Sequence, residues 1–149
     1  MRKLLFTLVI GFLYAPLWAH EEEGFERAIE YRTGVMEVFA WNMHQMGQMI
    51  KGKQNHDPAR FSAWARDLNA ASQLDLLAGF PEDSDAGDDT DARAEIWLDW
   101  ENFVAKLDAL RKATDKLAKI SNSADMNELK TGFQAVGKAC KSCHKAFRE

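Results

Sequence analysis

Cysteine is scarce in this 149-residue chain, which has only two, three positions apart near the C-terminus. A disulfide between them would close a very small loop and contribute little stabilisation. The sequence also lacks an internal repeat, a low-complexity tract, a cluster of basic residues and, after its first 13 residues, any apolar run of membrane-spanning length. These absences argue against a structural disulfide, a repeat architecture, nucleic-acid binding and a membrane-bound mature protein.

The N-terminus has the three parts of a secretory signal peptide. Arg2 and Lys3 precede an apolar segment, residues 4–13, and a small residue, Ala19, follows shortly after. A buried N-terminal helix is the alternative. Removal of residues 1–19 leaves residues 20–149, enough for one domain with one core. Cleavage would change the formal net charge from −4 to −6, because Arg2 and Lys3 are lost.

Four amphipathic helices are predicted, and no segment has a convincing strand pattern. Apolar residues recur every three or four positions in each of them, which indicates one buried stripe per helix. The predicted ranges are 22–51, 58–79, 91–117 and 125–147. Long helices with short connections favour an all-α fold, an antiparallel up-down-up-down four-helix bundle.

Two features mark the limits of the second helix and the connection after it. Asp57 is a predicted N-cap with Pro58 at the first helical position. Residues 79–90 are acidic enough to suggest a calcium loop, but their order does not fit an EF-hand. We interpret this segment as a solvated linker.

The motif Cys140-Lys141-Ser142-Cys143-His144 contains both cysteines. Two thiols at this spacing, followed at once by histidine, are typical of covalent haem c attachment, in which the imidazole binds the iron. A redox dithiol would favour a βαβ context, which the chain lacks. A zinc site would need a fourth ligand, and the candidates His44 and His56 are not at zinc-finger spacing.

The motif also fits the helix pattern. Cys140 and Cys143 continue the apolar stripe of the fourth helix, and His144 lies on the same side. Binding sites in helical bundles form between facing helices, so the bundle is expected to enclose one covalently bound haem. Phe133, Phe147 and Trp97 are candidates for its walls, or for ordinary core packing.

Three further residues are candidates for the haem environment. Arg32 interrupts the apolar stripe of the first helix, so it is expected either to pair with a haem propionate or to extend to solvent. Met36, one turn later, is a possible sixth iron ligand or a core residue. Arg148 either lies beside the His144 imidazole or is an exposed cation at the helix end.

Residues 25–149 resemble the class II c-type cytochromes, typified by cytochrome c′. The resemblance rests on CKSCHKAFR at the C-terminus, AIEYRTGVM in the first helix and DARAEIW at the start of the third. It implies thioether bonds to both cysteines and axial ligation by His144. The further haem-contacting positions that it implies are Arg32 at a propionate, Thr33 where the family commonly has Gln, Met36 on the distal side, Asp91 at the haem edge and Arg148 beside the proximal His.

The resemblance also implies a function. Family members are periplasmic homodimers with five-coordinate iron that bind NO and CO, with proposed roles in NO binding or detoxification and in electron transfer. We therefore expect a non-enzymatic, periplasmic haem c protein that binds diatomic gas and transfers single electrons. One alternative is a low-spin electron carrier with Met36 as sixth ligand. Another is a haem enzyme such as a peroxidase, for which His44 is the only first-helix candidate for the distal acid–base group.

Overall fold

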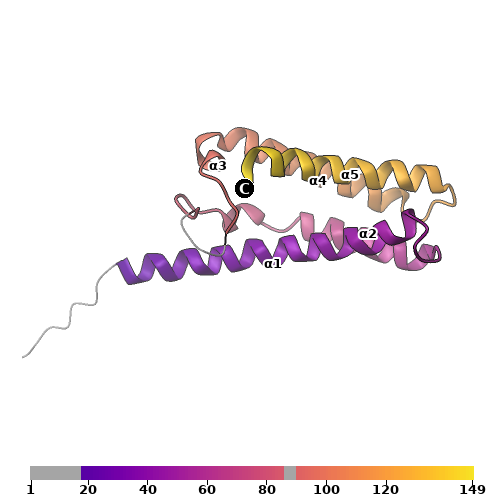
Figure 1. Cartoon of the computed structure of the whole chain (residues 1–149), viewed down its shortest axis with the longest axis horizontal. Coiled ribbons are helices and arrows are strands. Elements are labelled where there is room, and N and C mark those ends of the chain that lie inside the picture. Colours follow the sequence, from indigo (N-terminus) through magenta and orange to yellow (C-terminus); the bar gives the residue numbers. More distant parts are fainter. Residues whose placement is uncertain (1–17, 86–89) are drawn as a thin grey trace, which may run out of the picture.

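The computed structural model describes the backbone of residues 18–85 and 90–149, and the side chains of the same ranges from residue 25 onward. Four long helices form the molecule: α1 (Trp18–Ile50), α2 (Pro58–Ser72), α4 (Trp100–Ile120) and α5 (Met126–Phe147). They alternate in direction, with α1 and α2 in one layer and α4 and α5 in the other (Figure 1). The predicted all-α, up-down-up-down bundle is confirmed.

The predicted starts of the second and fourth helices agree with the observed caps. The Asp57 carboxylate accepts a hydrogen bond from the backbone N–H of Arg60 at 3.1 Å, with Pro58 as the first helical residue. Asp125 likewise caps α5 by accepting the N–H of Asn127 at 2.8 Å. Both carboxylates satisfy N–H groups that lack an intrahelical partner.

The core lies between the two layers and contains most of the predicted stripe residues. The largest fully buried side chains include Met46 of α1, Phe61 and Leu68 of α2, Leu117 of α4, and Leu129 and Val136 of α5. In the described part of the chain, no helix combines the length and the apolar character needed to cross a lipid bilayer. The predicted signal peptide lies outside the described residues except for its last two, which begin α1.

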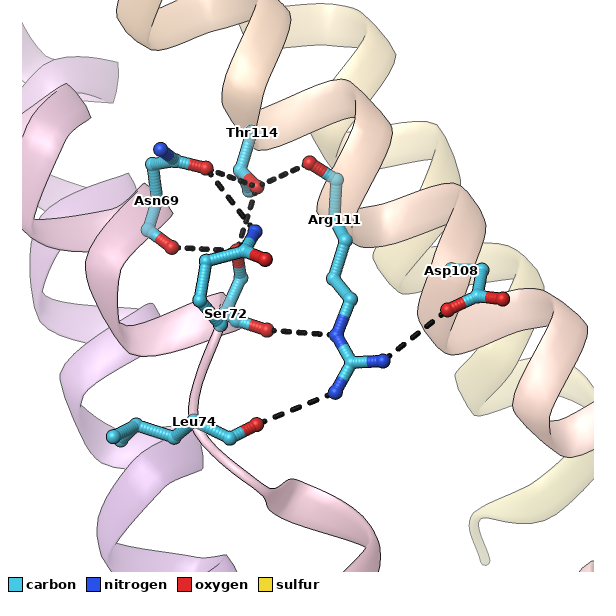
Figure 2. Close-up of polar contacts among 7 residues, drawn as sticks. Asn69, Ser72, Leu74, Asp108, Arg111 and Thr114 are labelled. Atoms are coloured by element: carbon cyan, nitrogen blue, oxygen red, sulfur yellow. Dashed lines mark hydrogen bonds and ion pairs between the residues drawn. The ribbon is translucent and has the colours of Figure 1, made fainter.

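The second helix ends earlier than the sequence predicts. It stops at Ser72 rather than Gly79 and is followed by a short 3-10 helix, η1 (Leu76–Gly79). Arg111 of α4 explains the early end, because its guanidinium donates to the carbonyl oxygens of Ser72 at 3.1 Å and Leu74 at 3.3 Å (Figure 2). The Leu74 side chain, predicted to continue the buried stripe, is exposed.

The third predicted helix is divided into two. Residues 91–93 are not helical, because the C-terminal tail binds them: the N–H of Arg93 donates to the carbonyl of Phe147, and the N–H of Glu149 to that of Asp91. A short helix, α3 (Glu95–Leu98), then ends at Asp99, whose backbone leaves the helical region, and α4 begins at the next residue. This break leaves Trp100, predicted to face the core, partly exposed.

Candidate functional site

A cavity of about 510 Å³ lies between α1 and α5. This volume is within the range of cofactor and ligand sites. Its lining includes the eight residues predicted to attach or contact a haem, namely Arg32, Thr33, Met36, Asp91, Cys140, Cys143, His144 and Arg148. The fold therefore brings together candidates that are up to 116 positions apart in the sequence.

Helix α5 carries the residues predicted to attach a haem. Leu129 and Val136 are fully buried and fix the side of α5 that faces the bundle. Cys140 and Cys143 extend this side into the cavity, where both thiols are half-buried and free. Gly137, one turn before Cys140, also lines the cavity, and a Cβ atom placed there would meet no heavy atom within 4 Å. This open wall next to two thiols and an imidazole fits a covalently held haem.

The electrostatic environment keeps these groups neutral. Burial raises the pKa of the Cys140 and Cys143 thiols, although the Lys106 ammonium partly opposes this effect at Cys143. Burial and, to a lesser extent, the positive charge of Arg148 lower the pKa of His144. Neutral imidazole is the form that ligates metals, so His144 is prepared for that role.

Neither alternative for the motif gains support from the structure. Thiols with a raised pKa are unlike those of redox dithiols, whose reactivity depends on a lowered pKa. Among the described residues, no group of three or more His, Cys, Asp or Glu side chains could hold a metal ion, so a zinc site lacks its ligands.

Arg32 reaches the cavity from α1, but its guanidinium is bound by the connection that follows η1. It donates hydrogen bonds to the carbonyl of Gly79 at 2.9 Å, to the hydroxyl and carbonyl of Ser84 at 2.7 and 2.6 Å, and to the hydroxyl of Thr90 at 2.5 Å. It also lies 4.9 Å from the centre of the Phe80 ring. Only 4% of the residue is exposed, so the expected extension to solvent is wrong.

These bonds attach the connection to α1. Gly79 allows the close approach, because a Cβ there would lie 2.9 Å from the Cβ of Arg32. As a result, Phe80 and Thr90 both line the cavity.

Asp91 and Arg148 form an ion pair beside the cavity. The Asp91 carboxylate accepts a hydrogen bond from Nε of Arg148 at 2.9 Å, and Nη2 of Arg148 lies 2.6 Å from the same oxygen. The pair adds to the backbone bonds between residues 91–93 and the C-terminal tail. It holds the last turn of α5, which carries His144, against the segment that precedes α3.

The α1 side of the cavity, opposite His144, is largely apolar. Half-buried Met36 and buried Phe39 form its centre, and Ala40 and Met43 extend it. The polar residues on this side, Thr33 and Glu37, are exposed. His44 is also exposed, does not line the cavity and lies 3.3 Å from the Gln48 amide.

The cavity walls differ in part from the predicted ones. Phe147 lines the cavity as expected, but Phe133 packs near Gly47, and the Trp97 indole donates to the Phe80 carbonyl at 3.3 Å. The sequence reasoning did not assign Phe80, Thr90, Gly137, Ile96 or Phe103 to the site. The sequence could have indicated three of them, because Gly137 lies three positions before Cys140 and seven before His144, and Ile96 and Phe103 lie on the apolar stripe of the third predicted helix. Phe80 and Thr90 lie in a segment without periodicity, so no sequence pattern indicated that they line the cavity.

Comparison with known proteins agrees with this geometry. A sequence model of the family described as Cytochrome C′ matches residues 27–148. The chain is 36% identical to cytochrome c′ of Halomonas halodenitrificans over 128 residues, which cover 83% of this chain and 96% of that protein. It is also 27% identical to cytochrome c-554 of Cereibacter sphaeroides over 145 residues, covering 96% and 94% of the two chains.

Solved structures give the same result. Cytochrome c prime from Shewanella frigidimarina superposes with a TM-score of 0.80 at 38% identity, covering 84% of this chain and 96% of that one. A nitric oxide complex of a variant of cytochrome c prime from Alcaligenes xylosoxidans gives a TM-score of 0.75 at 32% identity, covering 84% of this chain and 95% of that one. The chain therefore belongs to the cytochrome c′ family, whose members bind haem c covalently through two cysteines near the C-terminus, and haem c is its cofactor.

Proposed function

We propose that this protein is a periplasmic haem c protein that binds diatomic gases, mainly NO and CO, and transfers single electrons. Bound haem supplies an iron that ligates a gas molecule and cycles between the ferric and ferrous states. Cys140 and Cys143 would hold the haem through thioether bonds, and the neutral imidazole of His144 would ligate the iron. The nitric oxide complex of the Alcaligenes relative supports gas binding as the activity of this family site.

Four further residues position the haem. Thr33 and Asp91 lie at the haem edge, and Arg32 lies on the propionate side, where its charge favours the carboxylates. Most of the Arg32 donors already bind the 79–90 connection, so its effect on a propionate is mainly that of a nearby positive charge. Arg148 lies next to the proximal imidazole and influences it through its charge.

The apolar wall opposite His144 carries the proposal. Met36, Phe39, Ala40 and Met43 offer a small neutral molecule an environment without a strong proton donor. Peroxide cleavage needs a polar acid–base group on that side. His44, the candidate for such a group, lies outside the cavity lining, and Glu37, whose carboxylate is the acidic group on this side of the lining, is exposed. Gas binding therefore fits this wall better than peroxidase activity.

The low-spin electron carrier remains the second candidate, because Met36 lines the cavity on the side opposite His144. A thioether within bonding distance of the iron would occupy the gas site. We favour a Met36 that crowds the distal side without binding the iron, in keeping with the cytochrome c′ family. In that case crowding weakens gas binding but does not prevent it.

Carbon monoxide binding tests the proposal. In the ferrous holoprotein, Met36→Ala should raise the CO affinity, because the variant removes a side chain from the gas site. Met49→Ala is the matched control, since Met49 is buried in α1 but does not line the cavity. Equal CO affinities in the parent, Met36→Ala and Met49→Ala proteins would contradict the proposed distal site.

A further inference from the structure

After Glu128, all charged side chains of helix α5 are positive. Between residues 129 and 148 the chain has five Lys or Arg residues and no Asp or Glu, although its overall formal net charge is −4. The lysines are three and four positions apart, so they form no cluster in the sequence and the helix gathers them on one side. Lys138, Lys141 and Lys145 are all exposed.

Lys106 of α4 extends this basic face. Its ammonium group donates a hydrogen bond to the hydroxyl of Ser142 at 2.9 Å, so it reaches the turn of α5 that contains both cysteines. In the described part of the chain, no carboxylate lies within 4.0 Å of the ammonium groups of Lys106, Lys138, Lys141 or Lys145.

Some cations elsewhere in the bundle have a carboxylate partner nearby in the sequence. Lys119 pairs with Asp115 at 2.7 Å, and Arg111 pairs with Asp108 at 3.2 Å. On α5, by contrast, Lys141 and Lys145 are like charges at i and i+4, a spacing that destabilises a helix. The helix dipole favours cations only in the last turn, which begins after Lys141. This arrangement costs helix stability, and an oppositely charged partner would remove the cost.

The basic face adjoins the haem-attachment motif. Lys141 lies between the two cysteines, and Lys145 directly follows His144. We propose that Lys138, Lys141, Lys145 and Lys106 dock the acidic surface of a one-electron redox protein. The inference rests on the proposed electron transfer and adds the charge and the docking position of the partner. One electron passes between the redox centre of that partner and the haem iron, and no bond forms or breaks.

Two small oxidants of opposite charge test this surface. Ferricyanide takes one electron from the ferrous holoprotein and becomes ferrocyanide, and the tris(phenanthroline)cobalt(III) cation takes one electron and becomes cobalt(II). If the net negative charge of the protein controlled the encounter, ferricyanide would be repelled and its rate of oxidation of the protein would rise with salt. If the basic face controls the encounter, ferricyanide is attracted and the oxidation rate falls with salt, which stopped-flow measurements would show.

Charge reversal locates the effect. The triple variant Lys138→Glu, Lys141→Glu, Lys145→Glu should oxidise at least about tenfold more slowly with ferricyanide at low salt, and its salt dependence should reverse. The cobalt cation should react faster with this variant.

The matched control is Lys51→Glu, Lys53→Glu, Lys130→Glu, which has the same net charge. Lys51 and Lys53 are exposed in the turn after α1, and Lys130 lies ten residues before Cys140, about 15 Å along the helix. Equal slowing in both triple variants, or a parent rate with ferricyanide that rises with salt, would overturn the proposal.

Calorimetry with a poly-glutamate peptide separates this inference from the proposed function. If the parent and the control variant bind poly-glutamate and the α5 triple variant does not, the docking surface is supported. If, in addition, neither oxidant accepts an electron from the holoprotein, only the proposed electron transfer fails. A parent holoprotein that does not bind poly-glutamate, or that prefers a DNA duplex, would overturn the inference of an acidic protein partner.

Discussion

Arg32 shows how much one residue can differ from its expected role. The sequence offered two outcomes for an arginine in an apolar stripe, a haem propionate or solvent. In the structure its guanidinium instead binds Gly79, Ser84 and Thr90. These partners lie in a connection without periodicity, so no sequence pattern could have identified them. The arginine is thus a structural clamp as well as a charge near the cavity.

Replacing Arg32 should affect both stability and redox chemistry. Arg32→Ala leaves buried acceptors unpaired and should lower the free energy of unfolding of the holoprotein by about 1.5–3 kcal/mol or more. The loss of a buried positive charge should also favour the ferric state and lower the reduction potential. Denaturant unfolding and a redox titration measure the two effects. Arg27→Ala, at an exposed α1 position, is the control, and equal behaviour of both variants would argue against the clamp.

At the scale of helices, a buried polar network fixes α2 against α4. The Thr114 hydroxyl lies 2.8 Å from the Ser72 hydroxyl and 3.3 Å from the Asn69 side-chain oxygen (Figure 2). A second buried pair of hydroxyls, Ser62 and Ser121, lies 2.9 Å apart at the other end of the same contact. Because each group needs its partner, we infer that the two pairs specify the register of the helices.

Substitution of Thr114 tests this network. Thr114→Val keeps the side-chain shape but removes the hydroxyl that bonds the buried Ser72 hydroxyl and the Asn69 side-chain oxygen, so the free energy of unfolding should fall by about 0.5–1.5 kcal/mol. Adding Ser72→Ala should cost less than the sum of the single changes, because both partners are then removed. Thr131→Val, at an exposed position of α5, should be nearly neutral. A similar loss from Thr114→Val and Thr131→Val in urea unfolding would contradict a role for the buried hydroxyls.

The helices were largely predictable, and the places where they break were not. Asp57-Pro58 and Asp125 are local signals, and a capping carboxylate needs only its own turn. By contrast, the end of α2 at Ser72 depends on another helix, because Arg111 of α4 donates a hydrogen bond to the Ser72 carbonyl oxygen. Residues 91–93 are not helical, because the C-terminal tail binds them. Such long-range causes leave no trace in the periodicity of the affected segment.

That the candidate residues of α5 lie together was predictable for a similar reason. Cys140, Cys143 and His144 lie within two turns of one helix, so their spacing alone places them on one side. Arg32, Met36 and Arg148 were candidates from their positions on the helices, Asp91 was matched only through the resemblance to known cytochromes, and the cavity lining includes them all. The Asp91–Arg148 ion pair was not predicted, because it depends on how the tail meets the segment before α3.

At the scale of the whole molecule, α1 presents an exposed apolar stripe. Tyr31, Val38 and Trp41 are spaced at helical intervals, and Trp41 has 62% of its surface exposed. We propose that this stripe packs against a second copy of the chain, consistent with the homodimers expected for this family. A tryptophan with most of its surface exposed is costly in water, and tryptophan is frequent at protein interfaces.

A single charged residue should separate the subunits. Trp41→Glu should convert a dimer into a monomer, as measured by analytical ultracentrifugation, without changing haem content. Leu98→Glu is the control, because Leu98 is 83% exposed but lies on α3, away from the stripe. A dimer that persists in Trp41→Glu would show that the interface lies elsewhere on the molecule. A parent protein that is already monomeric would show that the stripe forms no dimer interface.

The absorption spectrum of the ferrous holoprotein, with and without Met36→Ala, tests the central claim most directly. The claim is that His144 binds the iron on the α5 side and that the α1 side stays open to gas beside Met36. It predicts a high-spin ferrous spectrum with a broad Soret band in both proteins, and rapid conversion on addition of NO. Sharp low-spin α and β bands that disappear in Met36→Ala would contradict it and identify Met36 as the sixth ligand of an electron carrier.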